Sequence, residues 1–410
     1  MSKWYRLDNA AKIFPPSKNK YDAKIFRFSV SLKENIDKKV LEKALEKTLN
    51  EYPVFKSILK RGFFWYYLEE ANIKPIVVEE HLRPCSSFDN GNLFQVTYYK
   101  KRINLEVNHA LTDGTGTLIF LKSLAINYLN TKYNLKSEEA INTASTKESS
   151  LDSFKKYKTG KIKKTIENNK LAYQIKDEKF AENNLKIIEG IANVKEVLKL
   201  SKSYGVTLTV YLASVLIKSI GESMDIKERK KPIVIAIPVN LRNYYPSYTV
   251  RNFFNAVNIS YKYSGESLEE IIKVVNAEFK KNLDKENVKS KMNNMAILED
   301  IFILRLIPIF IKDFILRYAY KWTDFYQTMT LSNIGIIEVP KIYQDYIDYF
   351  DVFISTSKIQ ICMCSYLDKL LLSFSSQFIN SEIEKNFFRY LINEGVNITI
   401  NTNKIGEKNE

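Results

Sequence analysis

Two runs of alternating strand and helix patterns, separated by a long polar stretch, constrain the fold of this chain most strongly. Residues 130–184 are rich in Lys, Ser, Thr, Glu and Asn and contain few long apolar runs. Such a composition is typical of a linker with one or two polar helical pieces. We therefore expect an α/β (α+β) protein of two lobes, each a mixed sheet with flanking helices. We place the N-terminal lobe at residues 1–150, the polar linker at 151–184 and the C-terminal lobe at 185–410.

The first lobe opens with a clear strand pattern. Residues 24–32 alternate apolar and polar side chains, and Asp37 is placed to cap a helix that runs to about residue 49. Further strands are expected at 63–68, 93–99 and 103–108, followed by a helix at 117–129.

The second lobe repeats the mixture of elements. Strands are expected at 185–189, 232–238, 256–263, 328–333, 349–355, 360–366, 369–377 and 397–400, and helices at 193–204, 208–219, 267–279 and 382–393. Gly205 stands where a helix-ending glycine is usual. The sequence contains no internal repeat of short period.

Composition excludes several classes of protein. Hydrophobic residues make up 45% and charged residues 27%, which argues against disorder. Three cysteines cannot form the disulfide framework of a small secreted protein, so we expect a reducing, cytoplasmic setting. The two histidines, His81 and His109, lie in no Cys/His cluster with zinc spacing, so we expect no metal.

The formal charge of +15 suits an anionic partner such as nucleic acid, a membrane surface or a phosphate-rich cofactor. The excess is almost all lysine, scattered through a chain rich in Asn, Ile and Tyr. We therefore attribute most of it to a drift toward AT-rich codons, and we expect no nucleic-acid partner.

Residues 296–322 are the most apolar stretch, and the N-terminus lacks the apolar run of a signal peptide. The longest uncharged run in this stretch, 306–311, is far shorter than the ~20 residues that span a bilayer. Most of its charges, at Arg305, Lys312, Asp313, Arg317 and Lys321, fall close to one helical face. Two interpretations stay open: an amphipathic helix packed on the core, or a surface helix that rests on a membrane at the inner face or opens to an apolar substrate.

One short motif carries chemistry. In the segment 105–116, His109 follows a strand and shares its parity with Leu105 and Val107, so it projects beside an apolar face at the strand end. Asp113 and Gly114 follow at fixed offsets, and chance produces on the order of 0.002 such matches in this chain. Without further context, Asp113 could equally be a helix N-cap, Gly114 a turn residue and His109 a core histidine.

Three further segments place the motif in a known context. They are the helix–Gly–Val–Thr–helix stretch at 199–213, Pro-Val-Asn-Leu-Arg at 238–242 with Arg-Asn-Phe-Phe at 251–254, and Leu-Ser-Asn-Ile-Gly at 331–335. Together with the H-x-x-x-D-G motif, and in the same order, they resemble the CoA-dependent acyltransferase superfamily. This group includes chloramphenicol acetyltransferases, wax-ester synthases, condensation domains of peptide synthetases and alcohol acetyltransferases, and the last branch is the most similar.

The resemblance implies an architecture and roles for individual residues. It implies two chloramphenicol-acetyltransferase-like lobes with an active-site tunnel between them, and it makes His109 the general base. Asp113 becomes a structural carboxylate paired with Arg242, and Gly114 completes the motif. Ser332 and Asn333 become candidates for binding the oxyanion or lining the channel. A histidine suits the role of base because its ordinary pKa lies near 6.5.

The sequence departs from the family in places. Condensation domains usually carry two adjacent histidines, whereas Asn108 occupies the first place here, which weakens a peptide-bond function. Asn240 stands where many relatives have Asp, and Arg251-Asn252 replaces the common Gly-Asn pair. Plant-type enzymes carry a D-F-G-W-G strand, and this chain has none.

We therefore expect an acyltransferase that moves an acyl group directly from acyl-CoA to a small alcohol or amine, without a metal. Three alternatives stay open: an enzyme that takes the acyl group from a carrier protein, as condensation domains do; a lipid acyltransferase at the membrane surface, favoured by residues 296–322; and a catalytically silent binding protein. The presence of both His109 and Asp113 argues against the last.

Overall fold

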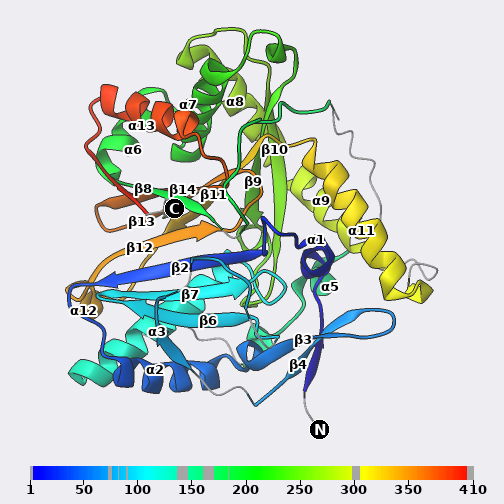
Figure 1. Cartoon of the computed structure of the whole chain (residues 1–410), viewed down its shortest axis with the longest axis vertical. Coiled ribbons are helices and arrows are strands. Elements are labelled where there is room, and N and C mark those ends of the chain that lie inside the picture. Colours follow the sequence, from blue (N-terminus) through cyan, green and yellow to red (C-terminus); the bar gives the residue numbers. More distant parts are fainter. Residues whose placement is uncertain are drawn as a thin grey trace, which may run out of the picture.

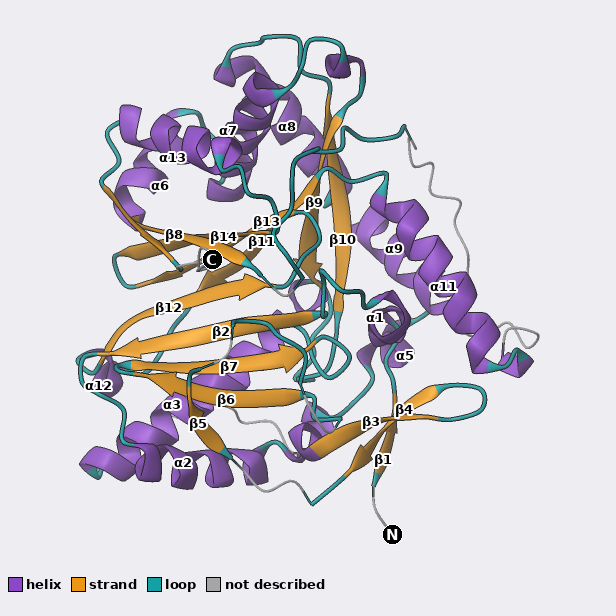
Figure 2. Ribbon diagram, viewed as in Figure 1, coloured by secondary structure: helices purple, strands orange, loops and turns teal. Residues whose placement is uncertain are grey.

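The computed structural model describes residues 3–72, 76–81, 83–88, 91–135, 146–159, 170–182, 184–297 and 305–403. The described strands form three sheets of five, seven and three strands. The two large sheets build two lobes, and helices cover the outer face of each (Figures 1 and 2). The expected two-lobed α/β architecture is confirmed.

The five-stranded sheet has the order β12-β2-β7-β6-β5. Its strands are β2 (Ile25–Leu32), β5 (Val77–Glu79), β6 (Phe94–Tyr99), β7 (Arg102–Asn108) and β12 (Ile347–Ile354). Helices α2 (Lys38–Glu51) and α3 (Gly114–Tyr133) pack on one face. The Asp37 carboxylate accepts the N–H groups of Lys39 and Val40 and so caps α2, a contact worth about 1 kcal/mol.

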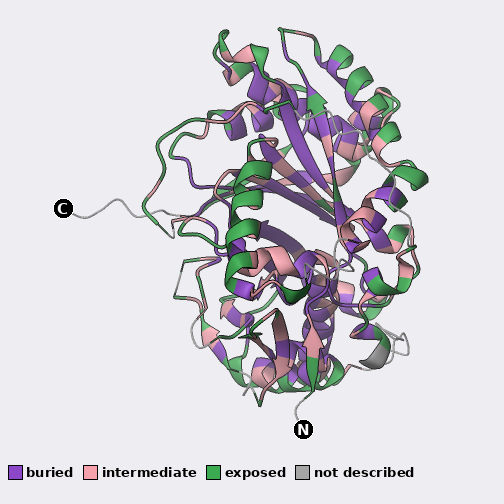
Figure 3. Ribbon diagram, turned by 90° about the vertical axis from the view of Figure 1, so that its right-hand side faces the viewer, coloured by how far each residue is buried: buried purple, intermediate pink, exposed green. Residues whose placement is uncertain are grey.

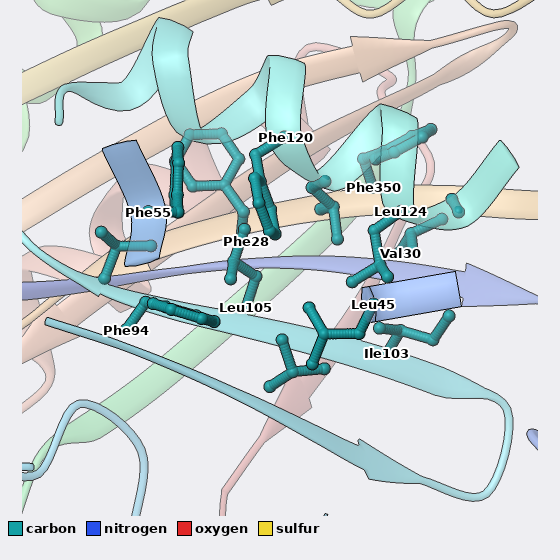
Figure 4. Close-up of a cluster of buried hydrophobic side chains, with 14 of the residues drawn as sticks. Phe28, Val30, Leu45, Phe55, Phe94, Ile103, Leu105, Phe120, Leu124 and Phe350 are labelled. Carbon is teal, nitrogen blue, oxygen red and sulfur yellow. The ribbon is translucent and has the colours of Figure 1, made fainter. Parts of the chain in front are cut away.

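Alternation along β2 and β7 separates an apolar face from a polar one. Their apolar side chains join those of α2 and α3 in one core, shown in Figure 4 by Phe28, Val30, Leu45, Phe55, Phe94, Ile103, Leu105, Phe120, Leu124 and Phe350. Each such burial contributes about 1.5–3 kcal/mol. On the opposite face, Arg27 donates to Glu106 and Ser29 to Asn104, so the buried polar groups there are paired.

The seven-stranded sheet has the order β10-β9-β11-β13-β14-β8-β15. Its strands are β8 (Lys186–Asn193), β9 (Ile233–Asn240), β10 (Phe254–Tyr261), β11 (Met329–Ile336), β13 (Ile359–Tyr366), β14 (Lys369–Ser376) and β15 (Ile398–Thr402). Helices α6 (Val194–Ser203), α7 (Leu208–Ser223), α8 (Leu268–Asn282) and α13 (Glu382–Asn393) supply the second core. Gly205 has a φ of +67° just after α6, a conformation that glycine adopts without strain.

The strand β13 belongs to both cores. Ile359, Ile361 and Met363 face the core of the seven-stranded sheet. Cys362, Cys364 and Tyr366, which alternate with them, lie in the core of the five-stranded sheet. The inner face of the larger sheet therefore packs against the N-terminal lobe, and the two lobes share a continuous apolar seam.

One strand crosses between the lobes. β12 lies within the expected C-terminal range 185–410, yet it pairs antiparallel with β2 in the five-stranded sheet. The expected ranges 1–150 and 185–410 therefore do not coincide with the two sheets. Periodicity identifies β12 as a strand, but only its long-range partner decides which sheet it joins.

The polar stretch at residues 130–184, which includes the expected linker, contributes short helices. α4 (Thr146–Ser149) and α5 (Ser153–Tyr157) lie against the loop that precedes β10. The N–H of Val250 donates to the carbonyl of Ser149 at 2.8 Å, and the hydroxyl of Tyr157 donates to the carbonyl of Pro246. The described parts of the linker thus help to hold residues 246–250 in place.

The three-stranded sheet corrects one sequence expectation. It consists of β1 (Trp4–Arg6), β3 (Ser57–Arg61) and β4 (Tyr66–Glu70), in the order β1-β4-β3. The strand expected at 63–68 was placed too early, because residues 62–65 form the hairpin turn, closed by a bond from the Gly62 N–H to the Trp65 carbonyl. The remaining helices are α1 (Phe14–Ser17), α9 (Lys285–Ile297), α11 (Ile309–Asp324) and α12 (Lys341–Gln344).

The helix α11 has an unusual orientation for an amphipathic helix. Only Ile309 and Asp313 are buried, whereas Phe310, Phe314 and Trp322 are exposed. For α11 the interpretation that the apolar face packs on the core is therefore wrong, and residues 298–304 of the expected segment lie outside the described residues. Among the described helices, none by itself has the length and hydropathy to cross a bilayer; α6 and α7 reach the threshold only as a pair bent by 83°.

Candidate active site

His109 follows β7 directly and lies where the two lobes meet. Its backbone N–H donates to the carbonyl of Lys24 at 2.8 Å, which fixes the chain at the strand end. Three aromatic rings surround the imidazole: Phe14 stacks on it with 4.2 Å between ring centroids, Phe26 approaches edge-on at 4.8 Å and Phe254 lies at 5.6 Å. The site therefore combines α1 and β2 of one lobe with β10 of the other.

One nitrogen of the imidazole is engaged. Nδ1 lies 3.3 Å from Oδ1 of Asn252, and Nδ2 of the same amide donates to the carbonyl of His109 at 3.1 Å. The Asn252 side chain is thus hydrogen-bonded to both the ring and the backbone of His109. Among the residues that the structure describes, none is hydrogen-bonded to Nε2, so this nitrogen is left to meet a substrate.

The surroundings keep the imidazole neutral. Burial among apolar rings lowers the pKa of His109 from 6.5 to about 4, against the opposing effects of the Asp113 charge and the Asn252 hydrogen bond, which raise it. A neutral imidazole at neutral pH has a free lone pair, as a general base needs.

Asp8 supports Asn252 from behind. Its carboxylate accepts the Nδ2 of Asn252 at 3.3 Å and the N–H of Ala11 at 2.8 Å, and it faces Arg251 at 3.6 Å. Burial raises the pKa of Asp8 to about 6 in spite of the Arg251 charge. The buried carboxyl group of Asp8 is therefore linked to His109 through Asn252.

The ion pair that the resemblance implies between Asp113 and Arg242 is present. Oδ2 of Asp113 accepts Nη1 of Arg242 at 2.8 Å, and Oδ1 lies 3.3 Å from Nη2. The same carboxylate accepts the N–H of Gly116 at 2.9 Å and that of Phe253 at 2.8 Å. Asp113 is therefore both the N-cap of α3 and the partner of Arg242, the two roles that the sequence left as alternatives.

Arg242 is the centre of a backbone clamp. Besides Asp113, its guanidinium donates to the carbonyls of Thr249 at 2.9 Å and Arg251 at 2.7 Å. These bonds fix the loop that carries Asn252. The pair therefore connects the turn after His109 with the loop that binds its ring.

Two glycines, Gly114 of the motif and Gly116 just after it, differ in how closely other atoms approach them. A Cβ atom on Gly116 would lie 1.9 Å from the carbonyl oxygen of Val250, whereas one on Gly114 would lie 3.2 Å from Cδ1 of Ile334. The backbones of the two lobes meet at Gly116, so this position requires glycine. Gly114, which the motif singles out, begins α3 under much less constraint.

No family model and no curated protein matches the sequence. Solved structures, however, match nearly its whole length. Trichothecene 15-O-acetyltransferase TRI3 from Fusarium sporotrichioides is 12% identical, with a TM-score of 0.62 over 96% of this chain and 94% of that one. The first condensation domain of the calcium-dependent antibiotic synthetase is 12% identical, with a TM-score of 0.61 over 96% of each chain. TRI101 from F. sporotrichioides, solved with coenzyme A and T-2, is 12% identical, with a TM-score of 0.57 over 95% and 97%.

The chain has the fold of condensation domains and CoA-dependent acetyltransferases. At this level of identity the likeness concerns the fold, so the chemistry has to be argued from the side chains. In this condensation-like fold, His109 lies at the junction of the lobes, and Asp113 ties the turn behind it to the opposite lobe. The tunnel expected between the lobes stays a prediction.

Ser332 and Asn333, the two candidates for binding the oxyanion or lining the channel, lie on opposite faces of β11. Asn333 of β11 is exposed, and its Nδ2 donates to Oγ1 of Thr209 at the start of α7, so its oxyanion or channel role stays a prediction. Ser332 has the opposite parity and pairs in register with Cys362, whose side chain faces the N-terminal core. Ser332 therefore lies on the face toward the other lobe and remains a candidate for binding the oxyanion.

The cysteines offer no alternative nucleophile. Cys85, Cys362 and Cys364 are all buried and unpaired. Burial raises the pKa of Cys362 to about 12 and raises the pKa of each of the other two thiols well above its ordinary value. Within the described residues, no three His, Cys, Asp or Glu side chains come together as a metal site.

Sequence reasoning missed Phe14, Asp8 and the role of Asn252. Phe14 and Asp8 precede the first strand of the five-stranded sheet and carry no local signal. Asn252 lies inside the segment 251–254 that contributes to the resemblance, which was the one available signal. Its function emerges only when the two lobes are brought together.

Proposed function

We propose that this protein is an acyltransferase that moves an acyl group from acyl-CoA to a small alcohol or amine. The observation that carries the proposal is His109, which burial keeps neutral at the lobe junction and which Asn252 orients through Nδ1, with Nε2 left open. The fold, which it shares with TRI3 and with TRI101 in its coenzyme A complex, supports the choice of donor.

The reaction follows from these groups. Nε2 of His109 takes the proton of the acceptor while the acceptor oxygen or nitrogen attacks the thioester carbonyl. The carbonyl electrons move to an oxyanion, for which Ser332 is our candidate donor. When the C–S bond breaks, the imidazolium returns the proton to the departing thiolate. Transfer is direct, because the described residues place no hydroxyl or thiol within hydrogen-bonding distance of the imidazole.

A carrier-protein thioester is the second candidate donor. The match to 96% of a condensation domain favours it, whereas Asn108 at the first histidine position of such domains does not favour peptide-bond formation. The two donors differ in what holds the thioester, and they require the same base.

An acyl-CoA panel assayed by thiol release tests the proposal, with and without candidate alcohols and amines. We expect acceptor-dependent thiol release that falls by 10²–10⁴-fold in His109→Ala, as is usual when a general base is lost. His81→Ala is the matched control, because His81 is exposed and bonds only the Glu79 carbonyl among the described groups. Turnover from acylated carrier proteins alone would assign the second donor. Equal turnover in His109→Ala and wild type would remove His109 from the mechanism.

A further inference from the structure

The outward face of α11 is an unpartnered apolar surface. Exposed side chains recur at helical spacing along it: Phe310, Phe314, Ile315, Tyr318 and Trp322. Phe314 exposes 72% of its surface. A shallow groove between Phe314, Tyr318 and Trp322 runs along this helix. Figure 3 looks at this side of the molecule, with exposed residues in green. Isolated exposed apolar residues are ordinary, but a contiguous row of this size marks an interaction surface.

The tip of the β3–β4 hairpin extends this surface. Phe63 and Trp65 are exposed at the tip. The Ile309 N–H donates to the Phe63 carbonyl at 2.8 Å, and Nζ of Lys312 donates to the Phe64 carbonyl at 2.8 Å. The hairpin and the start of α11 are therefore hydrogen-bonded to each other. We call the set Phe63, Trp65, Phe310, Phe314, Ile315, Tyr318 and Trp322 the outer face.

The charges of α11 are sorted by sign. Its two carboxylates are engaged toward the protein: Asp313 accepts Arg61 at 3.0 Å and Tyr66 at 2.8 Å, and Asp324 faces Lys358 at 3.5 Å. Arg317 and Lys321, in contrast, are exposed, although Nε of Arg317 also donates to the Pro16 carbonyl. Lys12 and Arg6 lie close enough to Lys312 to reinforce the effect of burial in lowering its pKa. Cations therefore border the apolar face, and the two carboxylates of α11 are paired with basic groups.

We propose that the outer face docks on an anionic lipid bilayer. Aromatic side chains with polar edges, such as Tyr318 and Trp322, favour the boundary between headgroups and acyl chains. Phe310 and Phe314 add apolar area that enters the acyl region, and the cations attract anionic headgroups. A helix that turns its polar side to its own protein and its aromatic side outward suits a planar, apolar partner.

The inner side of α11 is bonded to segments that contact the candidate active site. Arg317 of α11 donates to the carbonyl of Pro16 at 3.2 Å, in the short helix α1 whose Phe14 stacks on His109. Tyr320 accepts Nζ of Lys24 at 2.7 Å, and the Lys24 carbonyl accepts the N–H of His109. If the proposed function holds, a bilayer on the outer face brings membrane-dissolved alcohols or long-chain thioesters close to the base.

Vesicle flotation tests the docking independently of activity. Full-length protein is floated with phosphatidylcholine vesicles and with vesicles that contain phosphatidylglycerol. We expect binding to the anionic vesicles, weakened by salt. Phe314→Glu should lower the bound fraction at least tenfold, and Lys321→Gln should lower it less. The matched controls are Ile226→Glu, at a side chain with 82% exposure on another part of the surface, and Lys227→Gln; both should bind like wild type.

The outcomes separate this inference from the proposed reaction. Unchanged thermal stability and unchanged turnover of a short, water-soluble substrate in Phe314→Glu show that the variant is folded, so its loss of binding supports the outer face. Absence of wild-type flotation with either vesicle overturns the proposal, whatever the thiol-release assay shows. Equal losses in Phe314→Glu and Ile226→Glu also overturn it. A wild-type dimer that Phe314→Glu converts to a monomer, without flotation, would assign the face to a second copy of the chain.

Discussion

Arg242 and Asp113 form an ion pair across the two lobes, with 2.8 Å between Nη1 and Oδ2. Both side chains are nearly buried, and each has further hydrogen-bond partners besides the other. Asp113 keeps the N–H groups of Gly116 and Phe253, and Arg242 keeps the carbonyls of Thr249 and Arg251. The pair therefore works as the centre of a network that aligns the turn after His109 with the loop of Asn252.

This network predicts unequal costs for removing its two members. Arg242→Ala leaves several backbone carbonyls and one carboxylate short of donors, and we expect it to lower the free energy of unfolding by about 3–5 kcal/mol. Asp113→Asn retains the shape and one acceptor, so it should cost about 1–3 kcal/mol. Activity should fall in both, because the loop that carries Asn252 loosens. Chemical denaturation and thiol release measure the two effects.

The double variant isolates the coupling. Once one charge is gone, removing the other no longer leaves a lone buried charge. The double change should therefore cost less than the sum of the singles by about 0.5–3 kcal/mol. Additive costs would show that the two groups stabilise the fold separately and that the pair does not couple the lobes.

Gly114 and Gly116 predict a contrast within one helical turn. In Gly116→Ala the new methyl group would lie 1.9 Å from the Val250 carbonyl oxygen, so the lobes must separate locally. We expect a loss of about 3 kcal/mol in the free energy of unfolding, with reduced activity. In Gly114→Ala the new methyl group would lie 3.2 Å from the flexible end of Ile334 and in ordinary contact with Phe28 at 3.5 Å, so we expect stability to change by about 1 kcal/mol or less. Thermal unfolding of both variants checks the contrast, and similar destabilisation would contradict it.

Local patterns were sufficient to predict most elements of this fold. The alternation of β2, the Asp37 cap of α2 and the glycine after α6 each reflect interactions between residues close in sequence, so they can be recognised without the tertiary structure. The placement of β12 beside β2 cannot, because the two strands are more than 300 residues apart and either lobe could accept an apolar strand. Periodicity likewise identified a helix in α11 without showing which face is buried.

The reversal of α11 has a specific cause. Asp313 is buried because Arg61 and Tyr66, brought by a hairpin some 250 residues earlier, satisfy its carboxylate. A pattern that assigns charged positions to solvent cannot foresee such a partner. The candidate site divides in the same way: His109 and Asp113 are readable as a local motif, whereas Asn252 and Phe14 reach the imidazole only through the meeting of the lobes.

Asn252 is predicted to be a positioning residue for His109. Asn252→Ala removes the partner of Nδ1 and the donor to the His109 carbonyl. We expect kcat to fall about ten- to a hundredfold with little change in the KM for acyl-CoA, because a small misplacement of a base is costly. Since the Asn252 bond raises the pKa of His109, its loss should also move the acid limb of the pH profile to lower pH. An unchanged limb with full activity would leave Asn252 a purely structural role.

The pH profile itself tests the environment of the base. Burial lowers the pKa of His109 to about 4, so the imidazole stays neutral as pH falls through 6.5 and takes up a proton only near pH 4. Because the reaction needs the neutral form, kcat/KM should hold down to about pH 4.5 and then decline. The groups that face this site with charge are Asp113, Lys24 and, through Asn252, Asp8.

Asp8 provides the control for that profile. Burial raises the pKa of Asp8 to about 6, so between pH 6 and 4 the folded state takes up a proton that the unfolded state does not, and this favours folding. The lowered pKa of His109 has the opposite effect in this range, because there the unfolded state takes up the proton. In Asp8→Asn this gain is absent, so we expect stability to fall more steeply than in wild type between pH 6 and 4. The limb of kcat/KM near pH 4 should remain. If the kcat/KM profile of wild type instead declines near pH 6, and this decline disappears in Asp8→Asn, the titrating group is Asp8. If kcat/KM declines near pH 6.5 in both proteins, the imidazole of His109 is solvated.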